Sequence, residues 1–207
     1  MKIGSKISIL LLALCQNGWA QGFVNLDFES ANIVLTDGLQ TFVTNAFPGW
    51  TVNPPYIVYD TVSLSGGSIT IWDSNYASPI QGEYSVGLAS VNEGTGYSIS
   101  LGQTGTIPSS AQSIIFWGTL GGMQVTFDGN PLNFTATGSG PGYAIYGADI
   151  SAYASQTGEL LFTLPPYVDG AVLDNIQFSS LPIPEPSVLA LTGLGGLLFG
   201  FRRWRNS

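Results

Sequence analysis

Carboxylates are the only charged side chains in the central part of this 207-residue sequence. Between Gln21 and Leu181 there are 12 Asp and Glu residues and no Lys, Arg or His, since all five Lys and Arg residues lie in the two terminal segments. Ser-His-Asp or Cys-His catalysis, zinc sites built from His or Cys, and phosphate loops need residues that this region lacks. Carboxylate chemistry remains, as in a two-carboxylate glycosidase or an oxygen-ligand metal site.

The central region carries a formal charge of −12, against −8 for the whole chain. It has no cation to neutralise phosphate groups, so we expect no nucleic-acid partner. Its carboxylates repel one another at low ionic strength, and divalent cations are the obvious counterions outside the cell. The sequence marks no glycosidase pair, because Glu83 and Glu93 each lie in a short polar turn that is typical of solvated carboxylates.

Asp174 is the carboxylate with the most unusual predicted position. In the expected strand Val172–Ser179, alternation places Asp174 on the same face as Ile176 and Phe178, which is the apolar and inward face. A carboxylate on that face needs compensation. Backbone N–H groups and hydroxyls are one source of it, and a hard cation with oxygen ligands is another. The sequence leaves both sources open.

Aromatic residues next to polar ones form a second kind of candidate site. Sugar binding needs exposed aromatic platforms beside hydrogen-bonding groups. Trp72 and Tyr76 enclose the polar residues Asp73, Ser74 and Asn75 where a strand is expected to end, and they are the possible carbohydrate contacts. The alternative is that both rings pack in the core or against a loop.

Strands are the elements that must position these residues. Runs rich in Val, Ile, Thr, Phe and Tyr recur about every 10–15 residues and are separated by Gly, Pro, Asn and Asp. Asp128-Gly129-Asn130 is a strong hairpin signal, and only Ile150–Ser155 is typical of a helical turn. We expect an all-β fold with one antiparallel β-sandwich over residues 21–181. The predicted strands are Phe23–Glu29, Gln40–Thr44, Trp50–Val52, Tyr56–Asp60, Ser68–Trp72, Tyr84–Ala89, Tyr97–Leu101, Ser113–Gly118, Met123–Phe127, Leu132–Ala136, Tyr143–Tyr146, Glu159–Leu164 and Val172–Ser179.

The first 20 residues have the pattern of a signal peptide. Lys2 and Lys6 form a basic start, Ile7–Leu14 is an unbroken apolar stretch, and small residues precede a cleavage point after Ala20. Cys15 leaves with this segment, so the mature chain has no thiol and no disulfide. We therefore expect export through the Sec machinery.

Residues 182–207 form a C-terminal tail with three parts. A Pro184-Glu185-Pro186 triplet precedes the apolar run 188–201, and arginines follow within 202–205. The run is about 21 Å long as a helix, short of the ~30 Å hydrocarbon core, so local thinning would have to accommodate it. The arginines place the C-terminus in the cytoplasm and the body outside. A plain membrane anchor without processing is the alternative interpretation.

This tail resembles the PEP-CTERM sorting tail of proteins exported by Gram-negative bacteria. The resemblance implies processing by a membrane exosortase near Pro184-Glu185-Pro186, after the chain has been held briefly in the inner membrane by its transmembrane helix. It implies a final location in the cell envelope, on the outer surface or in the extracellular space.

Three short motifs in the body carry a second resemblance. Residues 25–29 read NLDFE and are followed by PGW at 48–50, residues 148–154 read ADISAYA, and residues 173–178 read LDNIQF. This order resembles the galactose-binding-like jelly rolls of carbohydrate-binding modules, and more closely the jelly-roll bodies common among PEP-CTERM proteins. In the carbohydrate-binding relatives, a glutamate of the first strand and an aspartate of the last often ligate a structural Ca²⁺. The matching positions are Glu29 and Asp174, and a solvated strand-end charge is the alternative for Glu29.

The sequence thus predicts a non-catalytic protein of the envelope or matrix. Its body would act as a structural or interaction module associated with surface polysaccharide. A carbohydrate-binding module with defined glycan specificity is the alternative, and a glycosidase is a more distant one.

Overall fold

The computed structural model describes residues 22–36, 38–53, 57–59, 68–90, 97–168 and 170–183. Their regular structure is almost entirely strand, apart from one helix of four residues, α1 (Val43–Ala46), and a 3₁₀ helix at Ser151–Tyr153. The predicted β-rich fold and the helical turn within Ile150–Ser155 are confirmed. The predicted signal peptide (1–20), sorting motif and membrane helix lie outside the described residues. Across the described ranges, no helix has the length and apolarity needed to cross a membrane.

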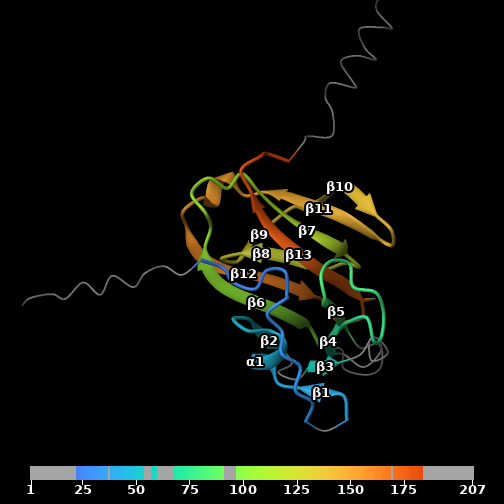
Figure 1. The fold of residues 1–207 in the computed structure, drawn as a ribbon. Coiled ribbons are helices and arrows are strands. Elements are labelled where there is room, and N and C mark those ends of the chain that lie inside the picture. The colour runs from blue at the N-terminus through green and yellow to red at the C-terminus, as the bar shows by residue number, and fades with distance from the viewer. Residues whose placement is uncertain are drawn as a thin grey trace, which may run out of the picture.

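The strands form two sheets, which Figure 1 shows packed against each other. The larger sheet has eight strands and the smaller has five. In spatial order the larger sheet contains β1 (Gln40–Thr41), β3 (Ile57–Tyr59), β4 (Ser68–Trp72), β5 (Ser85–Ala89), β13 (Ala171–Ser179), β7 (Ser113–Thr119), β11 (Tyr143–Asp149) and β10 (Thr135–Gly140). The smaller contains β2 (Thr51–Asn53), β6 (Ile99–Thr106), β12 (Thr157–Leu164), β8 (Gln124–Phe127) and β9 (Asn130–Pro131).

One hydrophobic core lies between the two sheets. Along β12 buried and more exposed side chains alternate, as expected for a strand with one face on a core. Phe162 of β12 meets Phe116 of β7 edge to face, with ring centroids 6.0 Å apart, so these two rings join the sheets directly. Trp50 also packs on Phe162, at 6.3 Å. The arrangement is that of a β-sandwich.

Pairing between the strands is antiparallel with one exception. β3 and β4 run parallel, with Val58 opposite Thr70. The predicted hairpin at Asp128-Gly129-Asn130 is confirmed: it joins β8 to β9, and both Asp128 (φ 47°) and Gly129 (φ 76°) take the left-handed conformation that a tight hairpin turn requires.

Two predicted strands near the N-terminus were wrong in part. Phe23–Glu29 contains turns instead of a strand, because Asn25 (φ 50°) and Phe28 (φ 63°) have left-handed backbone conformations that break an extended run. The predicted strand Gln40–Thr44 ends at Thr41, and the chain then enters α1. Phe28 is fully buried against Phe47 and Trp50, so core packing holds this turn in place.

β5 in the larger sheet is buried on both faces. Val86 and Leu88 point into the core, so Ser85 and Ala89 lie on the opposite face, yet they too are inaccessible to solvent. A further layer of chain must therefore cover the outer side of the sheet here. That layer includes the connection from β4 to β5, residues 73–84, called the 73–84 loop below.

Candidate functional site

The 73–84 loop brings together all four of the body residues singled out in the sequence. Trp72 precedes it and Tyr76 lies within it. Asp174 accepts a hydrogen bond from the backbone N–H of Gln81, and Glu29 accepts hydrogen bonds from the N–H groups of two later loop residues. The loop is therefore the common element of the candidate site.

Asp174 is fully buried, but on the other face of β13 from the one predicted. Leu173 pairs with Val86 of β5, and both are core residues, so Asp174 points away from the core together with Ser85. The expected alternation fails because the register shifts after Asp174, where Asn175 has a φ of 47°. Ile176 therefore returns to the core face while Asp174 lies beneath the 73–84 loop.

One oxygen of Asp174 is well satisfied and the other is not. Oδ2 accepts hydrogen bonds from Ser85 Oγ at 2.7 Å and from the N–H of Gln81 at 3.0 Å. Oδ1 is buried and has no hydrogen-bond partner. Burial raises the pKa of Asp174 to about 6; the hydrogen bonds from Ser85 and Gln81 oppose this rise, and the charge of Glu29 adds to it. Such an environment favours a proton or a cation at Oδ1.

Glu29 holds the far end of the same loop through backbone hydrogen bonds. Its carboxylate accepts the N–H of Glu83 at 2.8 and 3.0 Å and that of Tyr84 at 3.2 Å. Gly82 leaves the room for this contact: a Cβ there would overlap the Glu29 carboxylate, and its φ of +62° is disfavoured for other residues. The turn at Phe28 aims Glu29 at the loop.

The start of the loop is an aromatic and polar cluster of Tyr59, Asp73, Asn75 and Tyr76, called the tyrosine cluster below. Tyr59 donates its hydroxyl to Asp73 Oδ2 at 2.6 Å, and the N–H of Asn75 binds Asp73 Oδ1 at 2.8 Å. Tyr76 packs edge to face on Tyr59 with ring centroids 5.0 Å apart, and 38% of Tyr76 remains exposed. An exposed ring next to a carboxylate and an amide has the chemistry of a sugar contact.

Trp72 does not share this exposure. Only 6% of the residue is accessible, and its Nε1 is buried without a hydrogen-bond partner. Trp72 pairs with Ser85, so it lies on the outer face of the sheet that is covered here. It offers no ring surface for stacking, in contrast to Tyr76.

The two halves of the site are electrostatically connected through Tyr84. Burial is the main cause that raises the pKa of Tyr84, followed by the charges of Glu83, Asp73 and Glu29. The phenol thus lies within range of carboxylates from both the tyrosine cluster and the Glu29 contact. The sequence reasoning missed Tyr59, Gln81 and Ser85. For Asp73 and Asn75 the signal was the short Asp-x-Asn spacing of a turn in which the aspartate accepts a nearby N–H.

Two buried oxygen atoms of this site have the chemistry of ligands to a hard cation. Asp174 Oδ1 and Gln81 Oε1 are both buried and unpartnered, and both are oxygen acceptors of the kind that Ca²⁺ prefers. Glu29 is already compensated by backbone N–H groups. In the described part of the chain, no three His, Cys, Asp or Glu side chains gather around one point. Asp174 Oδ1 and Gln81 Oε1 are therefore the oxygens of this site that remain for a cation, and the charge of Glu29 acts on Asp174.

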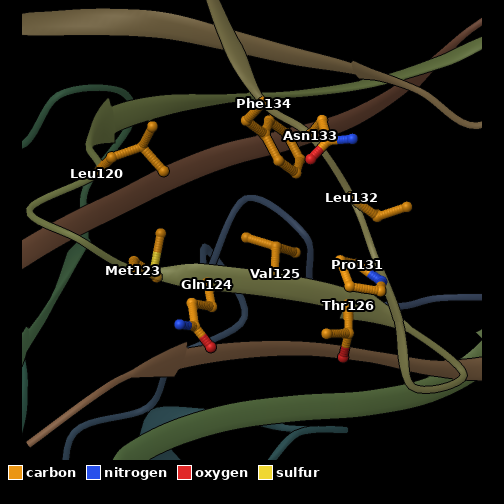
Figure 2. Close-up of a pocket in the computed structure, with 9 residues that line it drawn as sticks. All are labelled: Leu120, Met123, Gln124, Val125, Thr126, Pro131, Leu132, Asn133 and Phe134. Atoms are coloured by element: carbon orange, nitrogen blue, oxygen red, sulfur yellow. The ribbon is translucent and has the colours of Figure 1, made fainter.

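A separate groove of about 460 Å³ lies along β8 at the edge of the smaller sheet, and Figure 2 shows its lining. Val125, Leu132 and Phe134 give it an apolar wall, while Gln124 and Asn133 supply amides. None of the nine lining residues is ionisable except by extremes of pH. The predicted site residues lie elsewhere.

Comparison with known proteins identifies no family. No protein-family model matches the sequence, and no curated protein matches it. The fold is similar to two solved structures: an apo-form cyclase from Fischerella sp., at 13% identity and a TM-score of 0.42, and a cyclase from Fischerella sp. TAU, at 14% and 0.40. Each similarity covers 76% of this chain, and 93% and 94% of the respective cyclases.

The prediction that the body is non-catalytic is corrected by this finding. Both similar structures are of cyclases, and the prediction is not kept.

We expect stability to depend on pH through Asp174. Because the folded-state pKa is raised from 3.8 to about 6, the protonated group stabilises the fold fully below pH of about 4, and this contribution of about 3 kcal/mol is lost as pH rises through about 6. In chelator-treated protein, denaturant unfolding across this range should show the loss, and Asp174→Asn should remove it. Equal pH profiles for the variant and the wild type would contradict the assignment.

Proposed function

We propose that the chain is an exported protein of the bacterial cell envelope or extracellular matrix. A PEP-CTERM-like tail directs its sorting, and its body is a jelly-roll module that associates with surface polysaccharide. The observation that carries the polysaccharide part is the exposed ring of Tyr76, supported by Tyr59 beside the Asp73 carboxylate and the Asn75 amide.

The sorting part is supported by the sequence, in which the triplet follows the sandwich closely. Ser113 Oγ donates to the carbonyl of Leu181 at 2.7 Å, and Ile183 packs where a Cβ on Gly147 would lie. The chain is therefore held against the sandwich to within one residue of Pro184, and the triplet follows without a long linker. Exosortase is the partner that the resemblance implies, and the apolar run 188–201 is the proposed membrane contact.

The tyrosine cluster suits a sugar ligand because its polar groups are arranged in advance. Asn75 Nδ2 donates to Asp73 Oδ2 at 3.1 Å, and the same oxygen accepts from Tyr59. These contacts fix the carboxylate and leave the amide and ring at the rim. Preorganisation of this kind lowers the entropic cost of binding. It favours the second candidate function, a carbohydrate-binding module with defined specificity, over loose association with a matrix.

Calcium has a structural role in this proposal. A Ca²⁺ ion ligated by Asp174 Oδ1 and Gln81 Oε1, close to the charge of Glu29, would satisfy two buried oxygens and neutralise carboxylates that no side-chain cation compensates. Because Gln81 belongs to the 73–84 loop, the ion would fix the loop to β13. The tyrosine cluster at the start of that loop would be stabilised with it.

Calcium should raise the melting temperature well beyond magnesium at matched ionic strength. At free calcium of about 100 times the dissociation constant, one site contributes about 2.7 kcal/mol. Asp174→Asn should abolish the calcium-specific part, measured by thermal unfolding. Asp149→Asn is the matched control, since it removes an exposed carboxylate elsewhere. If calcium and magnesium raised the melting temperature equally, or if Asp174→Asn and Asp149→Asn responded equally to calcium, charge screening alone would explain the stabilisation and the specific site would be refuted.

Loss of the exposed ring should weaken glycan binding. We expect Tyr76→Ala to reduce affinity for surface polysaccharide fragments about tenfold or more, equivalent to about 1.4 kcal/mol. Binding would be measured on a glycan array and by calorimetry. Tyr97→Ala is the matched control, because Tyr97 is similarly exposed (43%) and lies two residues before the strand β6, outside the 73–84 loop. Equal losses in both variants, or no glycan bound by the wild type, would refute the site.

Processing of the tail should be visible in the mature protein. Mass spectrometry of protein recovered from the envelope or medium should find a C-terminus near Pro184-Glu185-Pro186. We expect Glu185→Ala to retain residues 188–207, whereas Glu159→Ala, which removes an exposed carboxylate of the body, should be processed normally. Recovery of the wild-type protein with its tail intact would contradict processing and would identify the tail as a plain membrane anchor.

A further inference from the structure

Four strands form the edges of the two sheets in the described part of the chain, and they differ in length. β1 and β9 have two residues each, β2 has three, and β10 has six. β9 also contains Pro131, which cannot donate a ladder hydrogen bond. Very short edges and proline are ways in which proteins prevent another strand from adding to a sheet. Among these four edge strands, only β10 is longer than three residues and free of proline, and Figure 1 shows it at the outside of the sheet.

The side chains of β10 do not block its edge either. Its sequence is TATGSG, and five of its six residues are exposed. β10 and the residues of β11 that pair with it, Tyr143–Gly147, lie in the segment 129–148, which contains no charged residue, although the body around it carries a formal charge of −12. Charged side chains are the common protection of an exposed edge. Here the strand is small, neutral and accessible.

An irregularity in β10 is compensated on its inner side. The register against β11 shifts between Ala136 and Gly138, and the Thr137 hydroxyl donates to the carbonyl of Ile145 at 3.2 Å. Pairing with β11 then continues regularly through Gly140. β10 is thus paired with β11 on both sides of the irregularity at Thr137, and among the described residues no strand lies on its other side.

We propose that β10 pairs antiparallel with β10 of a second copy of this chain, joining two eight-stranded sheets across a twofold axis. A second copy fits because the pairing is self-complementary, as a twofold interface requires. It also fits because two bodies of charge −12 repel each other least where neither presents a charge. With such small side chains, main-chain hydrogen bonds provide the contact. This inference does not depend on polysaccharide binding.

Single cysteines in β10 test the geometry. In full-length protein purified in mild detergent, with Cys15→Ser to remove the native thiol, Ala136→Cys, Thr137→Cys and Ser139→Cys would each be oxidised. A position at the twofold axis meets its own copy, so at least one variant should form a disulfide-linked dimer in high yield. Ser110→Cys, on an exposed loop, should stay monomeric. Equal cross-linking at Ser110 and in β10 would overturn the proposal.

A charge added to β10 tests the energetics without oxidation. Ser139→Glu places like charges close together across the twofold axis. Analytical ultracentrifugation should therefore give a dimer dissociation constant at least tenfold higher than that of the wild type. Ser110→Glu adds the same charge away from the edge and should leave the equilibrium unchanged. A wild-type protein that is monomeric at all concentrations, or a dimer that Ser139→Glu does not weaken, would overturn the proposal. Capture of a different protein by monomeric wild type would do the same.

Discussion

The absence of cationic side chains from the body is the constraint on which the arrangement of the site depends. A buried carboxylate costs several kcal/mol unless it is compensated, and in this body the compensation cannot come from Lys, Arg or His. Backbone N–H groups and one hydroxyl take that role. The 73–84 loop supplies the N–H groups to Asp174 and to Glu29, and Ser85 of β5 supplies the hydroxyl to Asp174. The same contacts hold the loop over the outer face of β5, which is why that central strand is buried on both faces.

The fold class was predictable because strand periodicity and turn chemistry are local properties of the sequence. The hairpin at Asp128-Gly129 was predicted for the same reason, since its backbone conformation follows from the residue types. The turn at Phe28 was not, because a bulky residue with positive φ is held there by core contacts that lie far away in the sequence. Helix α1 is also too short to show periodicity.

The candidate site shows the same division. The need of Asp174 for compensation could be read from its strand, but its face could not, because the irregularity after it shifts the alternation by one residue. Its backbone donor, the N–H of Gln81, could not be predicted, because every residue except proline has a backbone N–H and the side-chain pattern does not show which one will be used. Trp72 and Tyr76 were equivalent in the sequence. They differ in exposure in the structure, because Trp72 ends the covered strand β4 whereas Tyr76 lies in a turn.

The position of β13 has a mechanical consequence. Its C-terminal end leads through Leu181 to the proposed membrane tether, and near its middle Asp174 is hydrogen-bonded to the loop that carries the tyrosine cluster. Before the tail is cut, a pull between the membrane and a bound glycan would therefore run along this one strand. Ladder hydrogen bonds lie across the strand direction, so such a load would strain many of them together in shear instead of peeling them apart singly. β13 has a neighbour on each side, β5 and β7, so two ladders would share the load.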